Sequence, residues 1–311
     1  MSNKLQPILV LIGLVIAIVA VFLLVFAIRG EERSEGKIVI GSKEFTEQLV
    51  LTELLAQLIE AKAGLEIERK TGLGGTLICF GALKKGEIDL YPEYTGTGLK
   101  AILKHEENIT EPDKVYELVK KEFATQFNLE WLKSFGFNNT YALAMRKEHA
   151  DSLGISKVSD LVNHPELSCG FTAEFNERDD GYPGLAKHYG FKFEAEPKDL
   201  DPGLMYKAVK EKQVDVISAF ATDGRIQAYE LKVLEDDKRF FPPYYAAPLV
   251  RSETLKKHPE LTMLLNSLSG RIDDATMSGM NYEVDKGGKS PAQVAKEFLM
   301  REGLLAKMEE K

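Results

Sequence analysis

Residues 89–97 have the sequence DLYPEYTGT and follow a GLGGT run at residues 72–76. They predict a strand that ends in a Thr-Gly-Thr turn at residues 95–97, where aromatic faces would lie beside hydroxyl and backbone donors. This combination is typical of one wall of a small-ligand site. The alternative is an ordinary half-buried strand in which Pro92 marks the edge of a sheet. The rest of the chain favours the first interpretation.

The segments before this stretch alternate between strand and helix patterns. KIVIG predicts a β-branched strand, and leucine and isoleucine then recur at i, i+3, i+4 and i+7, which predicts an amphipathic helix closed by Gly64. The expected order is strand, helix, strand, helix and strand at residues 37–41, 44–62, 65–70, 77–85 and 87–91. Such a βαβαβ order is typical of a parallel sheet.

A second α/β cycle follows the first. Further strands are predicted at residues 137–146, 167–172 and 214–220, and further helices begin at Pro112, Asp201 and Ser290. The two halves are joined near residues 138–141 and 241–245, so the fold class is α/β with two lobes around a cleft. We expect lobe 1 to comprise residues 37–138 plus 242–311, and lobe 2 residues 139–241.

Residues 8–28 form a run of 21 without a charged or strongly polar side chain. As a helix the run is about 31 Å long, which matches the roughly 30 Å hydrocarbon core of a bilayer. It is longer than the usual apolar core of a signal peptide, so we expect an uncleaved transmembrane anchor, with a cleaved signal as the alternative. Lys4 precedes the run, which weakly favours an N-terminus inside the cell. Residues 1–36 are therefore an anchor or signal segment with a linker, and the bulk of the chain lies outside the cytoplasm.

The composition limits the possible partners. Residues 1–30 carry two basic and no acidic side chains, so the remainder has 38 basic and 48 acidic groups and a formal charge of −10. That charge argues against binding to nucleic acid. Cys79 and Cys169 lie ninety positions apart in apolar surroundings, which favours two buried free thiols over a disulfide.

Catalytic motifs do not occur in the sequence. The five histidines have no partner at metal-ligand spacing, and neither cysteine has a Cys-His signature. GLGGT lacks the Lys-Ser/Thr ending of a nucleotide loop, so we interpret it as a tight turn whose backbone amides could hold an anion. We expect no enzyme activity, no cofactor and no metal.

Several aromatic side chains fall at strand ends or in loops rather than at core periodicity. Four of them come from separate segments that should meet at the cleft: Tyr94, Tyr141, Phe220 and Tyr244. A quaternary ammonium group cannot donate a conventional hydrogen bond, but each ring face attracts it by about 0.5 to 2 kcal/mol. The four rings therefore suggest a cage for such a cation. Arg178 and Lys43 could hold a carboxylate at the other end of the ligand.

Six ordered motifs cover the chain from residue 37 onward. They are GSKEFTEQ (41–48), GLGGT (72–76), GEIDLYPEYTGT (86–97), FNNTYALAMR (137–146), FATDGRI (220–226) and VLEDDKRFFPPYYAAPLVR (233–251). Together they resemble the substrate-binding proteins of osmoprotectant ABC importers, which capture glycine betaine, choline, carnitine and related quaternary amines.

The resemblance implies a two-lobed periplasmic-binding-protein fold, similar to type II, which closes over its ligand by hinge motion and delivers it to a permease with its ATPase. Carried over by motif, the cage would be Tyr94, Tyr141, Phe220 and Tyr244, with Thr97, Lys43 and Arg178 on a carboxylate and Asn139 lining the site. Two positions depart from the family pattern, because Phe220 stands where Tyr is frequent and Asn139 where some relatives have an acidic residue. These departures leave the exact ligand open.

The sequence thus predicts the extracytoplasmic binding component of an ABC importer for a quaternary ammonium osmoprotectant. Glycine betaine is the first candidate ligand, with choline and carnitine as alternatives. The protein would be anchored to the outer face of the cell membrane, or periplasmic if the N-terminal segment is cleaved. A membrane-tethered sensor for the same ligands is the alternative function, and an enzyme on a similar frame is a third.

Overall fold

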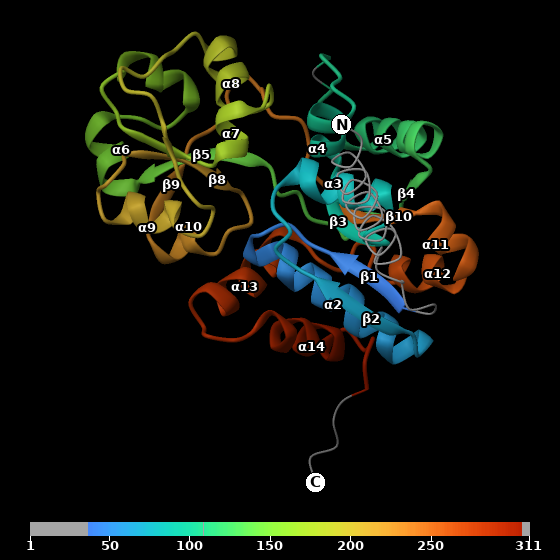
Figure 1. The fold of residues 1–311 in the computed structure, drawn as a ribbon. Coiled ribbons are helices and arrows are strands. Elements are labelled where there is room, and N and C mark those ends of the chain that lie inside the picture. The colour runs from blue at the N-terminus through green and yellow to red at the C-terminus, as the bar shows by residue number, and fades with distance from the viewer. Residues whose placement is uncertain (1–36, 108, 307–311) are drawn as a thin grey trace, which may run out of the picture. The chain divides into compact units, whose positions relative to one another are not determined.

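The computed structural model describes residues 37–107 and 109–306, whose strands form two mixed sheets with helices packed on them (Figure 1). Of the helices in this part of the chain, none combines the length and the hydropathy that a membrane span requires. The predicted anchor at residues 8–28 lies outside the described residues. Both sheets belong to a single unit that begins at Ile38.

The first sheet has five strands in the order β2-β1-β3-β10-β4. Their bounds are Glu66–Lys70 (β2), Lys37–Gly41 (β1), Leu90–Tyr94 (β3), Ala246–Arg251 (β10) and Leu129–Trp131 (β4). β3 is the central strand, because it pairs in parallel with β1 and antiparallel with β10. The sheet is therefore mixed, and β10 enters it from late in the sequence.

The opening motif DLYPEYTGT supplies this central strand, so the interpretation of Pro92 as an edge marker is wrong. The strand predicted at residues 87–91 is also displaced, because β3 begins at Leu90. A central proline is tolerated for two reasons. β1 ends before it reaches Pro92, and the residue that faces Pro92 on β10 is itself a proline, Pro248.

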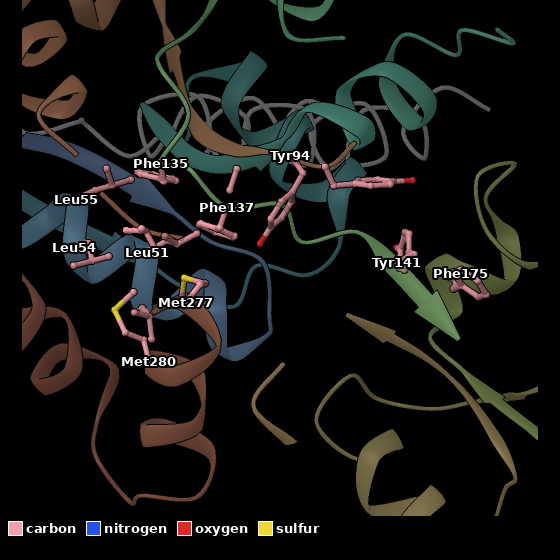
Figure 2. Close-up of a cluster of buried hydrophobic side chains, with 14 of the residues drawn as sticks. Leu51, Leu54, Leu55, Tyr94, Phe135, Phe137, Tyr141, Phe175, Met277 and Met280 are labelled. Atoms are coloured by element: carbon pink, nitrogen blue, oxygen red, sulfur yellow. The ribbon is translucent and has the colours of Figure 1, made fainter. Parts of the chain in front are cut away.

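Helix α2 (Thr46–Ala63) is the main support of the first sheet. It ends at Gly64, whose left-handed backbone closes the helix as predicted. Helices α12, α13 and α14 cover α2. Figure 2 shows its Leu51, Leu54 and Leu55 among Phe135, Phe137, Met277 and Met280. Because α2 packs against β2 and β3 as well as these helices, it is buried around much of its circumference rather than along one stripe.

The remaining helices on this side frame the sheet. They are α3 (Thr76–Lys85), α4 (Thr95–Thr97), the π-helical turn η1 (Gly98–Ile102), α5 (Pro112–Phe127), α11 (Ser252–Lys257), α12 (Glu260–Asn266), α13 (Asp274–Asp285) and α14 (Pro291–Arg301). α14 begins with the predicted capping box, in which Ser290 and Gln293 each bond the other's backbone N–H. The GLGGT turn leads directly into α3, and α4 follows β3 without a gap.

The second sheet also has five strands, in the order β7-β6-β8-β5-β9. Their bounds are Lys198–Asp199 (β7), Cys169–Phe171 (β6), Val216–Phe220 (β8), Tyr141–Arg146 (β5) and Leu231–Val233 (β9). Its helices are α6 (Lys147–Leu153), η2 (Val158–Asn163), α7 (Ala173–Glu177), α8 (Tyr182–Tyr189), α9 (Met205–Lys210) and α10 (Arg225–Ala228). β5 and β8 run antiparallel with Tyr141 directly opposite Phe220, so the register itself pairs two of the predicted cage residues.

The chain crosses between the sheets twice, from β4 to β5 and from β9 to β10. The crossing segments are joined by an antiparallel bridge between Asn138 and Tyr245, and the N–H of Asn139 donates to the carbonyl of Tyr244. The two crossings therefore lie side by side. The lobe boundaries at residues 138/139 and 241/242 stay a prediction.

The two cysteines are free and buried, as predicted, and they lie in separate hydrophobic clusters. Burial raises the pKa of both thiols, that of Cys79 to about 12. Neither thiol is therefore a reactive thiolate at neutral pH.

Candidate functional site

A cavity of about 700 Å³ lies between the two sheets, and side chains from both sides line it. All eight residues predicted to contact a ligand are among its lining residues: Lys43, Tyr94, Thr97, Asn139, Tyr141, Arg178, Phe220 and Tyr244. The fold thus brings together six separated segments of the sequence. A contact between these side chains and a ligand remains a prediction.

The four predicted rings form one aromatic cluster together with a fifth ring, Phe45. Phe45 stacks on Tyr94 and on Phe220, with ring centroids 6.3 Å and 5.3 Å apart. Tyr141 lies 5.5 Å from Phe220 and 5.6 Å from Tyr244, and its plane is inclined at 81° to that of Tyr244. Sequence reasoning missed Phe45, although the motif GSKEFTEQ contains it. The cluster is continuous from the first sheet to the second.

Two of the tyrosines have hydroxyl groups that carboxylates hold in place. Tyr94 donates to Glu47 over 2.7 Å and accepts from the Gln48 side chain over 3.1 Å. Tyr244 donates to Asp180 over 2.5 Å. Burial raises the pKa of both hydroxyls well above the usual value, so they stay neutral donors. Because these hydroxyl groups are bonded to other side chains, the part of each tyrosine that remains to contact a ligand is the ring.

The two predicted carboxylate-binding cations already have acidic partners. Lys43 is 4% exposed, and its Nζ lies 2.7 Å from Oε1 of Glu93. Arg178 bonds Asp180 with two nitrogens, Nε to Oδ1 over 2.7 Å and Nη2 to Oδ2 over 2.5 Å. Sequence reasoning missed both acids. Their charges compensate those of Lys43 and Arg178 before any ligand enters.

Glu47 links the site to both sheets through a buried carboxylate. Its Oε1 accepts from Tyr94 over 2.7 Å and from Asn139 over 2.9 Å, while its Oε2 accepts from Thr222 over 2.5 Å and from Asn281 over 3.1 Å. Burial raises the pKa of Glu47, against the opposing effect of the four donors. The Asn139 amide that was predicted to line the site is therefore engaged by Glu47. Sequence reasoning missed Glu47, because a glutamate in a first helical turn is usually solvated.

The turn at GLGGT holds a carboxylate of the protein itself. Glu174 on α7 lines the cavity and accepts the backbone N–H of Thr76 over 2.5 Å. The anion-binding capacity of the turn was predicted from the sequence, whereas its occupant was not. Within residues 37–107 and 109–306, no group of three or more His, Cys, Asp or Glu side chains is placed to hold a metal ion.

A mixed two-sheet fold with a ring-lined cavity between the sheets defines a small-molecule binding protein of the periplasmic type. A solved structure described as a glycine betaine/carnitine/choline ABC transporter has the same fold, with a TM-score of 0.71 and 37% identity. The match covers 86% of this chain and 99% of that one.

Two curated relatives are similarly close. The carnitine transport binding protein OpuCC of Listeria monocytogenes is 40% identical over 274 residues, which is 86% of this chain and 87% of the relative. The glycine-betaine-binding protein of Pseudomonas aeruginosa is 40% identical over 277 residues, which is 86% of this chain and 88% of the relative.

The family model for the substrate binding domain of the ABC-type glycine betaine transport system matches residues 36–301, and the chain belongs to this family. The resemblance carried by the six motifs is thereby confirmed. Members of the family are binding proteins of transport systems rather than enzymes, and they work outside the cytoplasm with an ABC permease.

Proposed function

We propose that this protein captures a quaternary ammonium osmoprotectant in the cavity between its sheets and delivers it to its permease. Glycine betaine is the first candidate, and choline and carnitine belong to the same class. The observation that carries the proposal is the continuous cluster of five rings across the cavity. A methylated nitrogen has no proton to donate, so ring faces take the place of hydrogen-bond acceptors. The relatives named for carnitine and glycine betaine support the same ligand class.

The proposed contacts follow the two ends of such a ligand. The methylated nitrogen would lie among Tyr94, Tyr141, Phe220 and Tyr244, and a carboxylate would approach Lys43, Thr97 and Arg178, with Asn139 beside it. Asp180 accepts hydrogen bonds from Nε and Nη2 of Arg178. The third nitrogen, Nη1, would therefore be the one that binds a ligand carboxylate. Nη1 lies 3.5 Å from Oγ1 of Thr76.

The proposed lobes are residues 37–138 plus 242–311 and residues 139–241. Their support is that rings of the cluster belong to both sheets, with Tyr94 on β3 and Tyr141 facing Phe220 on β5 and β8. A ligand among these rings would touch both lobes only when the lobes are closed. The gain in contact energy on closure would then drive hinge motion at the two crossing segments.

We further propose that residues 1–36 attach the binding domain to the outer face of the membrane. The support for this is the apolar run at residues 8–28, which has the length of a bilayer-spanning helix. If the run is cleaved as a signal, the mature protein would instead be periplasmic.

A thermal-shift panel on the full-length protein tests the ligand class. Glycine betaine, choline and carnitine should each raise the melting temperature, because a ligand that binds only the folded state stabilises it by RT ln(1 + [L]/Kd). Glycine and ethanolamine are the matched controls, since they keep the charged groups of betaine and choline but lack the methyl groups. Equal stabilisation by the controls and by the methylated ligands would contradict the proposal.

A further inference from the structure

Glu174 reaches across the cavity from the second sheet to the first. It lies on α7, and its carboxylate meets the start of α3, where the N–H of Thr76 donates to Oε1 over 2.5 Å. The Thr76 hydroxyl lies 3.4 Å from Oε2 and donates to it. The residue before α3 is Gly75, which has no side chain to cap the helix. A carboxylate from the opposite side of the cavity therefore serves as the N-terminal cap of α3.

The backbone at this turn leaves room for that carboxylate. A Cβ atom at Gly75 would lie 2.4 Å from Oε1 of Glu174 and 2.9 Å from its carboxyl carbon, which is far closer than such atoms can approach. A side chain at this position would therefore displace the Glu174 carboxylate, whereas glycine leaves it in place.

The donors around Glu174 are those that a ligand carboxylate would also need. Nη1 of Arg178 lies 3.7 Å from Oε2 of Glu174 and 3.5 Å from the Thr76 hydroxyl. The proposed function gives Arg178 a ligand carboxylate to bind, through that same nitrogen. Glu174 and a ligand carboxylate would therefore compete for one set of donors.

The electrostatics of the cavity favour a positive ligand. Its lining includes seven acidic and four basic side chains, an excess of three negative charges. One of the four basic side chains, Lys43, also forms an ion pair with the fully buried Glu93, which neutralises its positive charge. A ligand cation gains from this field, whereas a ligand carboxylate placed near Glu174 is repelled by it.

We propose that Glu174 is a specificity-determining residue, which lowers the affinity for ligands that carry a carboxylate relative to ligands that carry only the methylated cation. Choline leaves the cap of α3 undisturbed and gains from the Glu174 charge. Glycine betaine must displace the Glu174 carboxylate or lie beside it. This inference rests on the proposed function, because it assumes that quaternary amines occupy the cavity.

Glu174→Gln tests the inference by removing the charge while keeping an oxygen that can still accept the Thr76 N–H. Calorimetric titration of the full-length protein should show weaker choline binding and tighter glycine betaine binding in the variant. The ratio of the two affinities should change by about tenfold, which is the scale of one partly exposed charge at close range. A purely structural role would weaken both ligands together, so the opposite directions are diagnostic.

Glu194→Gln is the matched control. Glu194 undergoes the same change of charge on the same side of the molecule, but it is exposed to solvent, which screens its field, and it does not line the cavity. Its affinity ratio should stay within about twofold of the wild-type ratio. An unchanged ratio in Glu174→Gln, or an equal loss for both ligands, would overturn the inference while leaving the proposed function intact. Failure of the wild-type protein to bind either amine would overturn the proposed function, and the inference with it.

Discussion

The hydroxyl group and the ring of Tyr94 have different contacts. The hydroxyl is engaged between Glu47 and Gln48, and the ring stacks with Phe45 beside the cavity. A tyrosine held at its polar end has a fixed ring, so little conformational entropy is lost when a ligand packs against it. The same division holds for Tyr244, whose hydroxyl bonds Asp180. At the residue scale, the proposed cage therefore depends on Glu47 and Asp180, which hold the hydroxyl groups of two of its tyrosines.

Substitutions at Tyr94 separate the ring from the hydroxyl. Tyr94→Leu keeps an apolar side chain but removes the aromatic face, so the affinity for glycine betaine should fall by about tenfold or more, or about 1 to 2 kcal/mol. Tyr94→Phe keeps the face and should retain most of the affinity. Calorimetric titration of the full-length protein measures both. A loss of equal size in the two variants would show that the hydroxyl network, and not the ring, supports binding.

Glu47 connects elements that are distant in sequence. Its carboxylate, on α2, bonds Tyr94 on β3, Asn139 in the first crossing segment, Thr222 after β8 and Asn281 on α13. One side chain therefore joins both sheets at the point where the chain crosses between them. Two opposing effects act on its charge, since burial disfavours the ionised form and the four donors favour it.

The raised pKa of Glu47 predicts how the stability depends on pH. The folded state binds the Glu47 proton more tightly than the unfolded state, whose value is near 4.5. The contribution of this proton to the free energy of unfolding is therefore full below pH 4.5 and is lost as the pH rises through the higher folded-state pKa. Glu47→Gln removes the titration. Urea unfolding of both proteins over a pH series should show the wild type losing stability relative to the variant as the pH rises.

The opposite dependence of stability on pH would contradict a raised pKa for Glu47. If the wild type gained stability relative to Glu47→Gln with rising pH, the four hydrogen bonds would outweigh the burial of the charge, and the pKa of Glu47 would be lowered. The comparison of the two proteins cancels the titration of the other acids, since these are present in both.

The secondary structure was predictable wherever a local signal defined it. The helix before Gly64 and the capping box at Ser290 both occur as expected. The predicted central strand stopped at residue 91, whereas β3 continues through Pro92 to Tyr94. The register that places Pro92 opposite Pro248 involves β10, which comes much later in the sequence, so no local signal shows that this proline is tolerated. The local sequence pattern also could not predict that α2 is buried on several faces, because the helices that cover it, α12, α13 and α14, come from the last part of the chain.

The lining of the cavity was predictable from motifs, but its charge balance was not. All eight motif residues reach the cavity. The acids that hold them are identified only by distance in space, since Lys43 and Glu93 are 50 residues apart and Tyr244 and Asp180 are 64 apart. No spacing rule connects such pairs, and each acid alone resembles an ordinary surface residue.

At the scale of the whole molecule, the proposed closure of the cavity rests on the double crossing between the sheets. Tyr94 stands on the first sheet, Tyr141 and Phe220 face each other on the second, and Tyr244 lies in the returning crossing segment. A ligand among these rings, as proposed, would contact both sides at once. The permease would then meet a closed form that differs from the empty one.

A crystal structure of the protein with glycine betaine or choline bound tests the central claim most directly. The methylated nitrogen should lie within about 6 Å of the ring centroids of Tyr94, Tyr141, Phe220 and Tyr244, the range in which ring faces attract a cation. A nitrogen found away from these rings, or rings that point apart around an empty centre, would contradict it.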